Sequence, residues 1–247
     1  MKKKILGVLL AVGIISGVIA GCGNSNTTQN GAENASQASA TAKARTLDEI
    51  KKSGKIKIGV FSDKNPFGYV DENGKVQGYD VYFAKRIAKD LLGSEDAVDF
   101  VYVEAASRVE YLKSAKVDIT LANFTVTDER KKQVDFALPY MKVSIGVVSP
   151  KDKVIKDVKE LEGKTLIVTK GTTAETYFEK NYPNIKLQKY DQYSDAYQAL
   201  LDGRGDAFST DNTEVLAWAL ENKGYEVRVL DLINMEKSHC YNPFVYL

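Results

Sequence analysis

The chain has little of what catalytic and metal sites need: one histidine and two cysteines among 247 residues. A Ser-His-Asp or Cys-His catalytic group would depend on that single histidine, His239, and histidine-rich metal sites are excluded. Cys22 and Cys240 are too few for a four-cysteine zinc site and indicate no disulfide framework. A net charge of +1 offers no basic surface for nucleic acid. We therefore expect no metal, no cofactor and no nucleic-acid partner.

The N-terminus has the pattern of an export signal. Lysines at positions 2–4 precede an uncharged apolar run from Ile5 to Ala20, shorter than the ~20 residues of a membrane-spanning helix. Ala20 and Gly21 stand directly before Cys22, which resembles a bacterial lipoprotein signal, whose cysteine carries the lipid. We predict a signal peptide over residues 1–21 and an extracytoplasmic protein anchored to the cell membrane through Cys22. An uncleaved membrane helix is the alternative.

Residues 22–45 are predicted to form a flexible tether. Up to about Lys43 the segment consists mainly of Asn, Ser, Thr, Gln, Ala and Gly. A segment with so few large apolar residues cannot bury enough surface to fold. It would hold a folded domain away from the membrane.

Strand and helix patterns alternate twice after the tether, which predicts an α/β fold with two lobes, 46–146 and 147–233, and largely parallel sheets. A single continuous sheet is the alternative. Because open parallel sheets bind ligands at the carboxyl ends of their strands, we expect a ligand cleft between the lobes. The expected strands are 55–60, 98–103, 117–121, 165–168, 186–190, 206–210 and 226–230, and the expected helices are 81–91, 108–114, one from 127, 174–181, 194–202 and 212–222.

Charged and hydroxyl side chains follow several of these strands. Arg130, one turn into a helix, could bind a carboxylate together with Thr125, or could be a solvated or ion-paired residue. Asp211 could accept an ammonium or cap the next helix. The loop Gly171-Thr172-Thr173 offers amides and hydroxyls in the second lobe. A zwitterionic amino acid needs this division of charge, and bridging it would favour a closed state.

Two further residues near the same edge have open roles. Phe67, in the first strand-to-helix loop, could supply an apolar wall or pack locally beside Pro66. Arg108 could contact a ligand side chain or be structural.

At these positions the sequence resembles the family 3 extracytoplasmic solute-binding proteins, which have the two-lobe, type II periplasmic-binding-protein fold and deliver polar amino acids to ABC importers. The motifs in order are Gly78 to Ala88, Thr125 to Arg130, Gly171 to Thr173, and Asp211. Shorter strings, among them Leu121-Ala122-Asn123-Phe124-Thr125 and Pro66-Phe67-Gly68-Tyr69, resemble the cysteine-binding subgroup.

The resemblance implies roles for particular residues. Arg130 with Thr125 would hold the α-carboxylate and Asp211 the α-ammonium. Tyr82, where many members have an acid, suggests that this acid is not needed. Lys64, where binders of histidine and arginine often have a stacking aromatic, argues against a large cationic ligand. The other candidate ligand-binding residues are Asn123, Thr173, Arg108, Phe124, Phe67, Gly171 and Thr172.

We therefore expect a monomeric binding lipoprotein that captures a small polar amino acid, cysteine before others, and presents it to the membrane subunits of an ABC permease. One alternative is an enzyme on the same fold, such as a cyclohexadienyl dehydratase, with Glu104 as the candidate proton donor. A surface adhesin is a third interpretation, with no sequence feature in its favour.

Residues 234–247 do not resemble the family's ending. We expect a chain that is truncated or frame-shifted relative to its relatives. Its first lobe would then lack a strand, its hinge would have one secure crossing, and apolar surface would be exposed.

Overall fold

The computed structural model describes residues 43–237 and 240–241, and these described residues belong to one compact unit. The predicted signal peptide, Cys22 with its lipid, the tether up to residue 42, His239 and residues 242–247 lie outside the described residues. None of the helices within the described ranges has the length and apolar character needed to cross a membrane.

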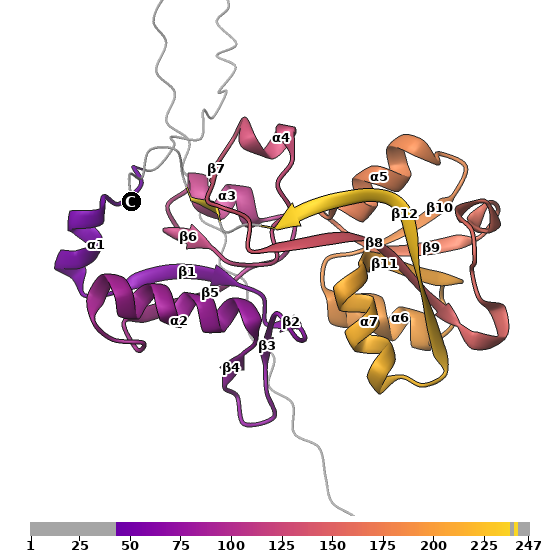
Figure 1. The fold of residues 1–247 in the computed structure, drawn as a ribbon, viewed down its shortest axis with the longest axis horizontal. Coiled ribbons are helices and arrows are strands. Elements are labelled where there is room, and N and C mark those ends of the chain that lie inside the picture. The colour runs from indigo at the N-terminus through magenta and orange to yellow at the C-terminus, as the bar shows by residue number, and fades with distance from the viewer. Residues whose placement is uncertain (1–42, 238–239, 242–247) are drawn as a thin grey trace, which may run out of the picture. The chain divides into compact units, whose positions relative to one another are not determined.

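The first lobe is built on a five-stranded sheet of order β5-β1-β6-β13-β7, of which Figure 1 labels β5, β1, β6 and β7. β5, β1 and β6 run parallel, so their carboxyl ends meet at one edge, and the loop after β6 begins the segment that carries Asn123 and Thr125. Helix α1 starts with a capping box between Thr46 and Glu49. The elements are α1 (Leu47–Ser53), β1 (Ile56–Val60), α2 (Tyr79–Leu92), β5 (Val98–Tyr102), α3 (Arg108–Lys113), β6 (Ile119–Thr120), α4 (Asp128–Lys131), β7 (Asp135–Phe136) and β13 (Cys240–Tyr241).

A small antiparallel sheet, which the sequence patterns did not predict, lies between β1 and α2 along the chain. It has the order β2-β3-β4 and consists of β2 (Asp63–Lys64), β3 (Gly68–Val70) and β4 (Val76–Gln77). Its strands of two or three residues are too short to show the alternation that identifies a strand in a sequence. Lys64, at the end of β2, is buried.

The second lobe contains a five-stranded sheet of order β10-β9-β11-β8-β12. β10, β9 and β11 are parallel, whereas β8 is antiparallel to β11. The structure has separate sheets rather than a single continuous one. The expectation of largely parallel sheets is corrected, because in each five-stranded sheet two of the four strand pairs are antiparallel. The elements are β8 (Met141–Pro150), η1 (Lys151–Lys153), η2 (Val158–Leu161), β9 (Thr165–Thr169), α5 (Thr173–Asn181), β10 (Lys186–Tyr190), α6 (Tyr193–Leu201), β11 (Ala207–Asp211), α7 (Asn212–Glu221) and β12 (Tyr225–Lys237).

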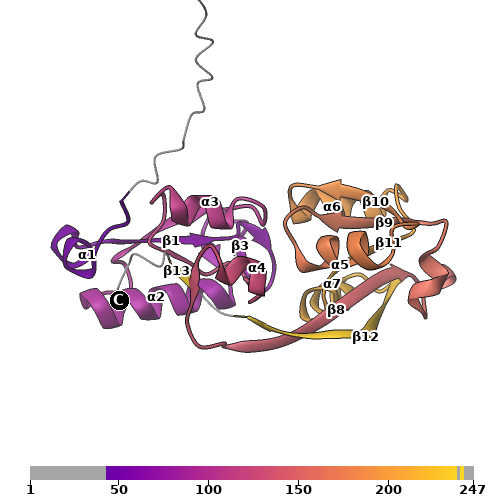
Figure 2. The same ribbon diagram turned by 90° about the horizontal axis from the view of Figure 1, so that it is seen from above.

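Two long strands, β8 and β12, run side by side between the lobes (Figure 2). They pair antiparallel from Met141 with Lys237 to Pro150 with Tyr225, with an irregularity between Val229 and Asn234. β13 then pairs with β6 and β7. The structure therefore corrects the expectation of a single crossing and of a missing strand in the first lobe. Strand pairing uses backbone groups that every non-proline residue carries, so an ending unlike the family's can still form it.

Apolar residues of both lobes share one buried cluster. Phe61, Val103 and Ala122 of the first lobe belong to it together with Ile167 and Tyr193 of the second. The rings of Phe61 and Tyr193 meet edge to face, with centroids 5.4 Å apart. In the same cluster, partly buried Trp218 stacks on Tyr197 with ring centroids 4.7 Å apart. Contact between the lobes is thus partly a hydrophobic contact.

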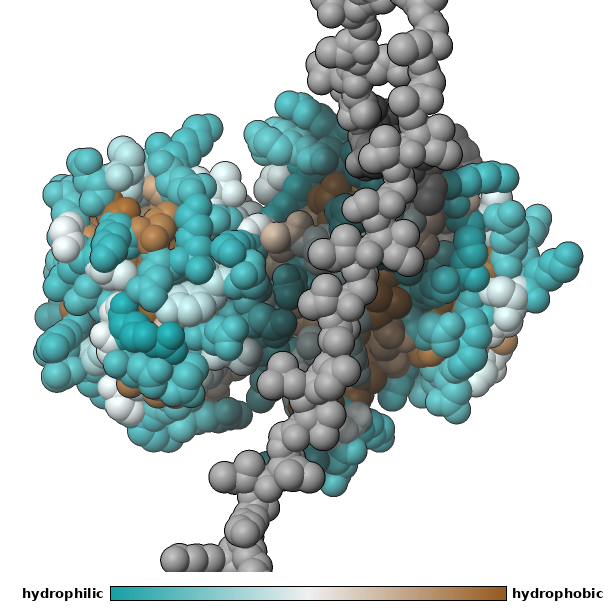
Figure 3. Space-filling view, turned by 180° about the vertical axis from the view of Figure 1, so that it is seen from behind, coloured by the Kyte–Doolittle hydropathy of each residue, from teal (hydrophilic) through white to brown (hydrophobic). Residues whose placement is uncertain are grey.

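The folded part begins slightly before the predicted boundary at residue 46. Ala44 is buried, and the Arg45 guanidinium contacts the Asp118 carboxylate, with Nε donating to Oδ1 at 2.9 Å. The end of the predicted tether therefore belongs to the first lobe. The face seen from behind is mainly hydrophilic, with apolar residues gathered in a few places (Figure 3). The exposed large apolar side chains are Val70, Tyr79, Tyr82, Tyr102, Leu138, Leu201, Leu216, Leu220 and Val229.

Candidate functional site

Asp211 is the last residue of β11 and stands at the N-cap position of α7. Its side chain makes no capping hydrogen bond to that helix. The Asp211 Oδ2 atom instead lies 2.7 Å from the Nζ of Lys237 and 3.9 Å from the Nζ of Lys64. Of the two sequence interpretations, contact with an ammonium group rather than helix capping describes this carboxylate, which is 4% exposed.

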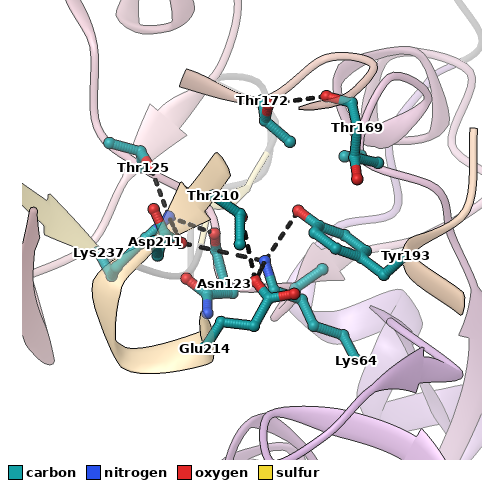
Figure 4. A network of polar contacts seen from close by, with 12 residues as sticks. Lys64, Asn123, Thr125, Thr169, Thr172, Tyr193, Thr210, Asp211, Glu214 and Lys237 are labelled. Atoms are coloured by element: carbon teal, nitrogen blue, oxygen red, sulfur yellow. Dashed lines mark hydrogen bonds and ion pairs between the residues drawn. The ribbon is translucent and has the colours of Figure 1, made fainter. Parts of the chain in front are cut away.

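The ammonium group on Asp211 belongs to Lys237, the last residue of β12. Its Nζ also donates to the backbone oxygen of Asn123 at 2.8 Å and to the hydroxyl of Thr125 (Figure 4). An ammonium group has three donors, so each of them has an oxygen partner. Asn123 and Thr125 lie in the first lobe and Asp211 in the second, so Lys237 connects the two lobes.

Lys64 forms a second buried connection between the lobes. Its Nζ lies 2.8 Å from the Oε2 of Glu214 and donates to the Tyr193 hydroxyl at 2.8 Å (Figure 4). Glu214 also accepts hydrogen bonds from Thr210 and from the hydroxyl of Tyr197. The side chains of Lys64 and Glu214 are each 1% exposed, so two cations and two carboxylates share one buried network.

The guanidinium groups of Arg108 and Arg130 converge on a single atom, the carbonyl oxygen of Gly171. Arg108 Nη2 donates to it at 3.0 Å and Arg130 Nη2 at 2.8 Å. Phe124 packs against both groups, with its ring centroid 4.1 Å and 4.4 Å from their central carbons. Arg130 also donates to the carbonyl of Thr125 at 2.8 Å. The first lobe therefore directs two cations at the loop of the second lobe that starts with Gly171.

The loop 171–173 meets the first lobe closely. Gly171 has a φ of +75°, and a Cβ there would lie 2.4 Å from the Cα of Ala106. Thr172 is the N-cap residue of α5, where its hydroxyl accepts from the Glu175 amide and donates to the carbonyl of Thr169 at 2.7 Å. Thr173 lines the cavity between the lobes. Only glycine provides both the left-handed conformation and the close approach that position 171 requires.

Asp80, which belongs to the motif Gly78 to Ala88, holds the backbone at Asn123 in place. Asp80 Oδ2 accepts the Asn123 amide at 2.8 Å, and Oδ1 accepts the Tyr140 hydroxyl at 2.9 Å. Asn123 has a φ of +46°, and both polar atoms of its side chain are buried without a hydrogen-bond partner among the described residues. Such a group is a candidate for contact with a ligand, because an unsatisfied buried amide is costly.

Three residues singled out in the sequence lie away from this constellation. Phe67 is 3% exposed and meets the ring of Tyr79 edge to face, at a centroid distance of 6.5 Å. Tyr82 is exposed on α2. Glu104 is exposed and accepts a hydrogen bond from Gln192 at 3.3 Å.

The space between the polar side chains is small. A cavity of about 10 Å³, room for about one water molecule, is lined by Arg108, Asn123, Thr125, Thr172, Thr173, Tyr193, Thr210, Asp211 and Lys237. A larger pocket of about 190 Å³ next to Tyr193 is lined by Asp63, Glu104 and Asp191 among others, but by none of the Arg130, Thr125 and Asp211 set. Among the described residues, no group of three His, Cys, Asp or Glu side chains could hold a metal ion.

Burial and charge set the protonation of the network. Burial raises the pKa of Glu214 to about 7 against the attraction of Lys64. It lowers the pKa of Lys237 to about 7 although Asp211 opposes the change. Burial would also raise the pKa of Asp211, but Lys237 and Lys64 outweigh it and hold that pKa below its ordinary value. Near neutral pH, Asp211 is therefore the fixed negative charge of the site.

Asp80→Asn should flatten part of the pH dependence of stability. Burial raises the pKa of Asp80 from 3.8 to about 6. A raised pKa means that the folded protein binds the proton more tightly, so this stability is present below pH 3.8 and is lost as the pH rises through about 6. At about 1.4 kcal/mol per pKa unit, the loss is ~3 kcal/mol.

Urea unfolding at several pH values measures this. The free energy of unfolding of the unmodified protein should fall by ~3 kcal/mol more than that of Asp80→Asn between about pH 4 and 7. Parallel pH profiles for the two proteins would contradict the assignment.

The Arg108 guanidinium and the Asp211 carboxylate line the same small space between the lobes, whereas Arg130 does not line it and contacts the Gly171 carbonyl. Two α/β lobes that close on such a buried site define a two-lobe solute-binding protein. The chain belongs to the bacterial extracellular solute-binding proteins, family 3, whose model matches residues 56–224. This confirms the family resemblance seen in the sequence motifs.

Individual relatives agree with this assignment. The chain is 34% identical over 227 residues to the ABC transporter glutamine-binding protein GlnH of Bacillus subtilis, covering 91% of this chain and 81% of that protein. It is 54% identical to the solute receptor for L-cysteine of Neisseria gonorrhoeae (TM-score 0.79; 80% and 81% covered). It is 55% identical to the cysteine-binding protein of Campylobacter jejuni (TM-score 0.78; 79% of each covered). These relatives are named as binding proteins or as a solute receptor, which supports solute binding over catalysis.

Sequence reasoning missed part of the site. Tyr193 and Glu214 lie in the first turns of helices, where a polar residue is normally explained as stabilising the start of the helix. Lys237 was assigned to the atypical tail. A lysine following an apolar strand pattern is ordinary in a sequence, and only the pairing of β12 with β8 brings its side chain to Asp211.

Proposed function

We propose that this protein is the extracytoplasmic binding component of an ABC amino-acid importer and that it captures a small polar amino acid between its lobes. The observation that carries the proposal is the division of charge in one buried site. Two guanidinium groups converge on one point, and the Asp211 carboxylate, which lines the same cavity as Arg108, is already in contact with the Lys237 ammonium. An amino acid carries the two charges that match this arrangement.

The roles follow from the chemistry of each group. Arg130 and the Thr125 hydroxyl would bind the α-carboxylate, because a guanidinium can donate two parallel hydrogen bonds to it. Asp211 would bind the α-ammonium. The side-chain amide of Asn123, which has no partner among the described residues, and Thr173 would line the space. Arg108, which bonds the Gly171 carbonyl, and Phe124, which packs against both guanidinium groups, would hold the carboxylate-binding part of the site in place.

Cysteine is the first candidate ligand. The space left between the closed lobes is small, which favours a short side chain over a long one. Two structurally similar proteins at 54% and 55% identity are named for cysteine. GlnH, at 34% identity, is named for glutamine, so glutamine is the competitor to test.

The remaining parts of the proposal concern the envelope. We infer that Cys22 carries a lipid, that the protein is a monomer held at the outer side of the cell membrane, and that it delivers its ligand to permease subunits. The family is described as extracellular and GlnH as part of an ABC transporter, which supports export and a permease partner.

A calorimetric panel tests the ligand. We expect heat of binding with cysteine, and weaker or no binding with cystine, aspartate, glutamate, glutamine, histidine and arginine. Circular dichroism and thermal unfolding should establish first that the sample is folded. A folded protein that gives no heat with any of these amino acids at millimolar concentration would refute the proposal.

A further inference from the structure

The ammonium group of Lys237 has the partners that an amino-acid ammonium would need. Its Nζ contacts the Asp211 carboxylate at 2.7 Å, the Asn123 carbonyl at 2.8 Å and the Thr125 hydroxyl. These partners come from both lobes, as they would around a bound amino acid, and the Lys237 side chain is 3% exposed. A second ammonium at this position would have to share these three groups with Lys237.

The backbone of Lys237 holds the side chain at this place. Within β12 it pairs with Met141 of β8, its carbonyl accepts the Tyr140 amide at 2.9 Å, and it forms an isolated bridge with Thr125. Because the ammonium is attached to a strand that is paired on these sides, its effective concentration at Asp211 is high. A free amino acid must compete against a group that does not diffuse away.

Surrounding charge makes joint occupancy unfavourable. Lys64 Nζ lies 3.9 Å from Asp211 Oδ2, and Arg108 lines the same cavity. Glu214 is engaged by Lys64 at 2.8 Å. An incoming α-ammonium would therefore lie close to three cations. It would also have to share Asp211 with Lys237, because the other carboxylate, Glu214, is paired with Lys64. A carboxylate ligand without an amine would meet the same cations without adding a positive charge beside Asp211, whose own charge Lys237 and Lys64 offset.

We propose that Lys237 is a specificity-determining residue of this site: its ammonium occupies the subsite for the α-ammonium, so it competes with the amine of an amino acid and lowers its affinity, but does not compete with a carboxylate that lacks the amine. This inference rests on the proposed function, because it assumes that small carboxylate ligands bind between the lobes. The site then discriminates between ligands by whether they carry an ammonium group, because Lys237 already supplies one.

The test compares two ligands that differ only in the amine, cysteine and 3-mercaptopropionate. Their affinities are measured by calorimetry for the unmodified chain, for Lys237→Met and for Lys142→Met. Lys142 is exposed on the neighbouring crossing strand β8, so its replacement removes a similar charge close by without touching the site. Lys237→Gln, which keeps a polar head, serves as a second variant should methionine beside Asp211 prevent folding.

We expect Lys237→Met to bind cysteine at least about tenfold more tightly than the unmodified chain, the factor that applies if Lys237 leaves the subsite open in about a tenth of the molecules. Binding of 3-mercaptopropionate should weaken in the same variant, since the ligand loses a neighbouring cation. Cysteine should also raise the melting temperature of Lys237→Met more than that of the unmodified chain. Lys142→Met should behave like the unmodified chain.

Two results would overturn the inference in distinguishable ways. If the unmodified chain and Lys237→Met, or Lys237→Gln in its place, prefer cysteine over 3-mercaptopropionate to the same degree, Lys237 does not set specificity, while the proposed function stands. If no folded variant binds either ligand or any amino acid of the panel, the proposed function fails and the inference fails with it.

Discussion

Arg130→Ala should weaken amino-acid binding by about a hundredfold or more. In the closed structure the Arg130 guanidinium donates to the carbonyls of Thr125 and Gly171, so it lies between the lobes, where the α-carboxylate is proposed to bind. Arg130 is half-buried, and a carboxylate bound to it between the closed lobes would cover it further. Removing one partner of a buried, hydrogen-bonded charge pair costs ~2–5 kcal/mol, and ~2.7 kcal/mol corresponds to a hundredfold change in the dissociation constant. Calorimetry with cysteine measures the effect.

The control is Arg86→Ala. Arg86 is an exposed residue of α2 that pairs with Asp90 one turn away, and such surface pairs contribute little. It removes the same charge at a distance from the site, so it separates loss of the carboxylate contact from loss of net positive charge. Both variants should be measured with and without Lys237→Met. Equal affinities for Arg130→Ala and Arg86→Ala in both backgrounds would show that Arg130 does not bind the carboxylate.

Gly171→Ala should prevent full closure and lower ligand affinity by about tenfold or more. A Cβ at this position would lie 2.4 Å from the Cα and 2.6 Å from the amide nitrogen of Ala106. Both atoms are backbone atoms and cannot turn aside as a side chain would. The lobes would have to separate, which weakens the bonds from Arg108 and Arg130 to the Gly171 carbonyl. A ligand that binds the closed state then loses affinity in proportion to the population of that state, a tenth giving about tenfold.

Gly203→Ala is the matched control, because Gly203 has a φ of +68° with nothing within 4 Å of an added Cβ. It introduces the same left-handed strain, ~1 kcal/mol, without a clash between the lobes. The melting temperature should therefore fall in Gly203→Ala and at least as far in Gly171→Ala, which also loses contacts between the lobes, whereas ligand affinity should fall only in Gly171→Ala. Small-angle scattering should show a larger radius of gyration for Gly171→Ala in the presence of ligand. An unchanged affinity in this variant would contradict the role of close approach at Gly171.

Much of the fold could be predicted from hydrophobic periodicity. The strand 186–190 and the helix 212–222 follow regular patterns, and the structure has β10 at Lys186–Tyr190 and α7 at Asn212–Glu221. The strands of the small sheet are too short for a period to appear. β12 was expected to end near residue 230, but it continues to Lys237. What extends it is pairing with β8, a contact that no local pattern reports.

The site shows the same division between local and distant information. Arg130 and Asp211 stand at positions that the ends of strands already mark, and the structure brings Asp211 into contact with an ammonium. Lys64 and Glu214 are far apart in the sequence and belong to different lobes, so they form a pair only because the lobes meet. A lysine and a glutamate far apart in sequence carry no signal that they neutralise one another in a buried place.

Because Trp218 stacks on Tyr197, its fluorescence should respond to closure of the lobes. Tyr197 donates to Glu214 at 3.4 Å, and Glu214 is paired with Lys64 of the other lobe. Separating the lobes withdraws the lysine charge from the carboxylate to which the stacked tyrosine is bonded, and so changes the electric field at the indole. Since the chain has a single tryptophan, its tryptophan emission comes from this one residue of the second lobe and should change when the lobes separate, without any attached label.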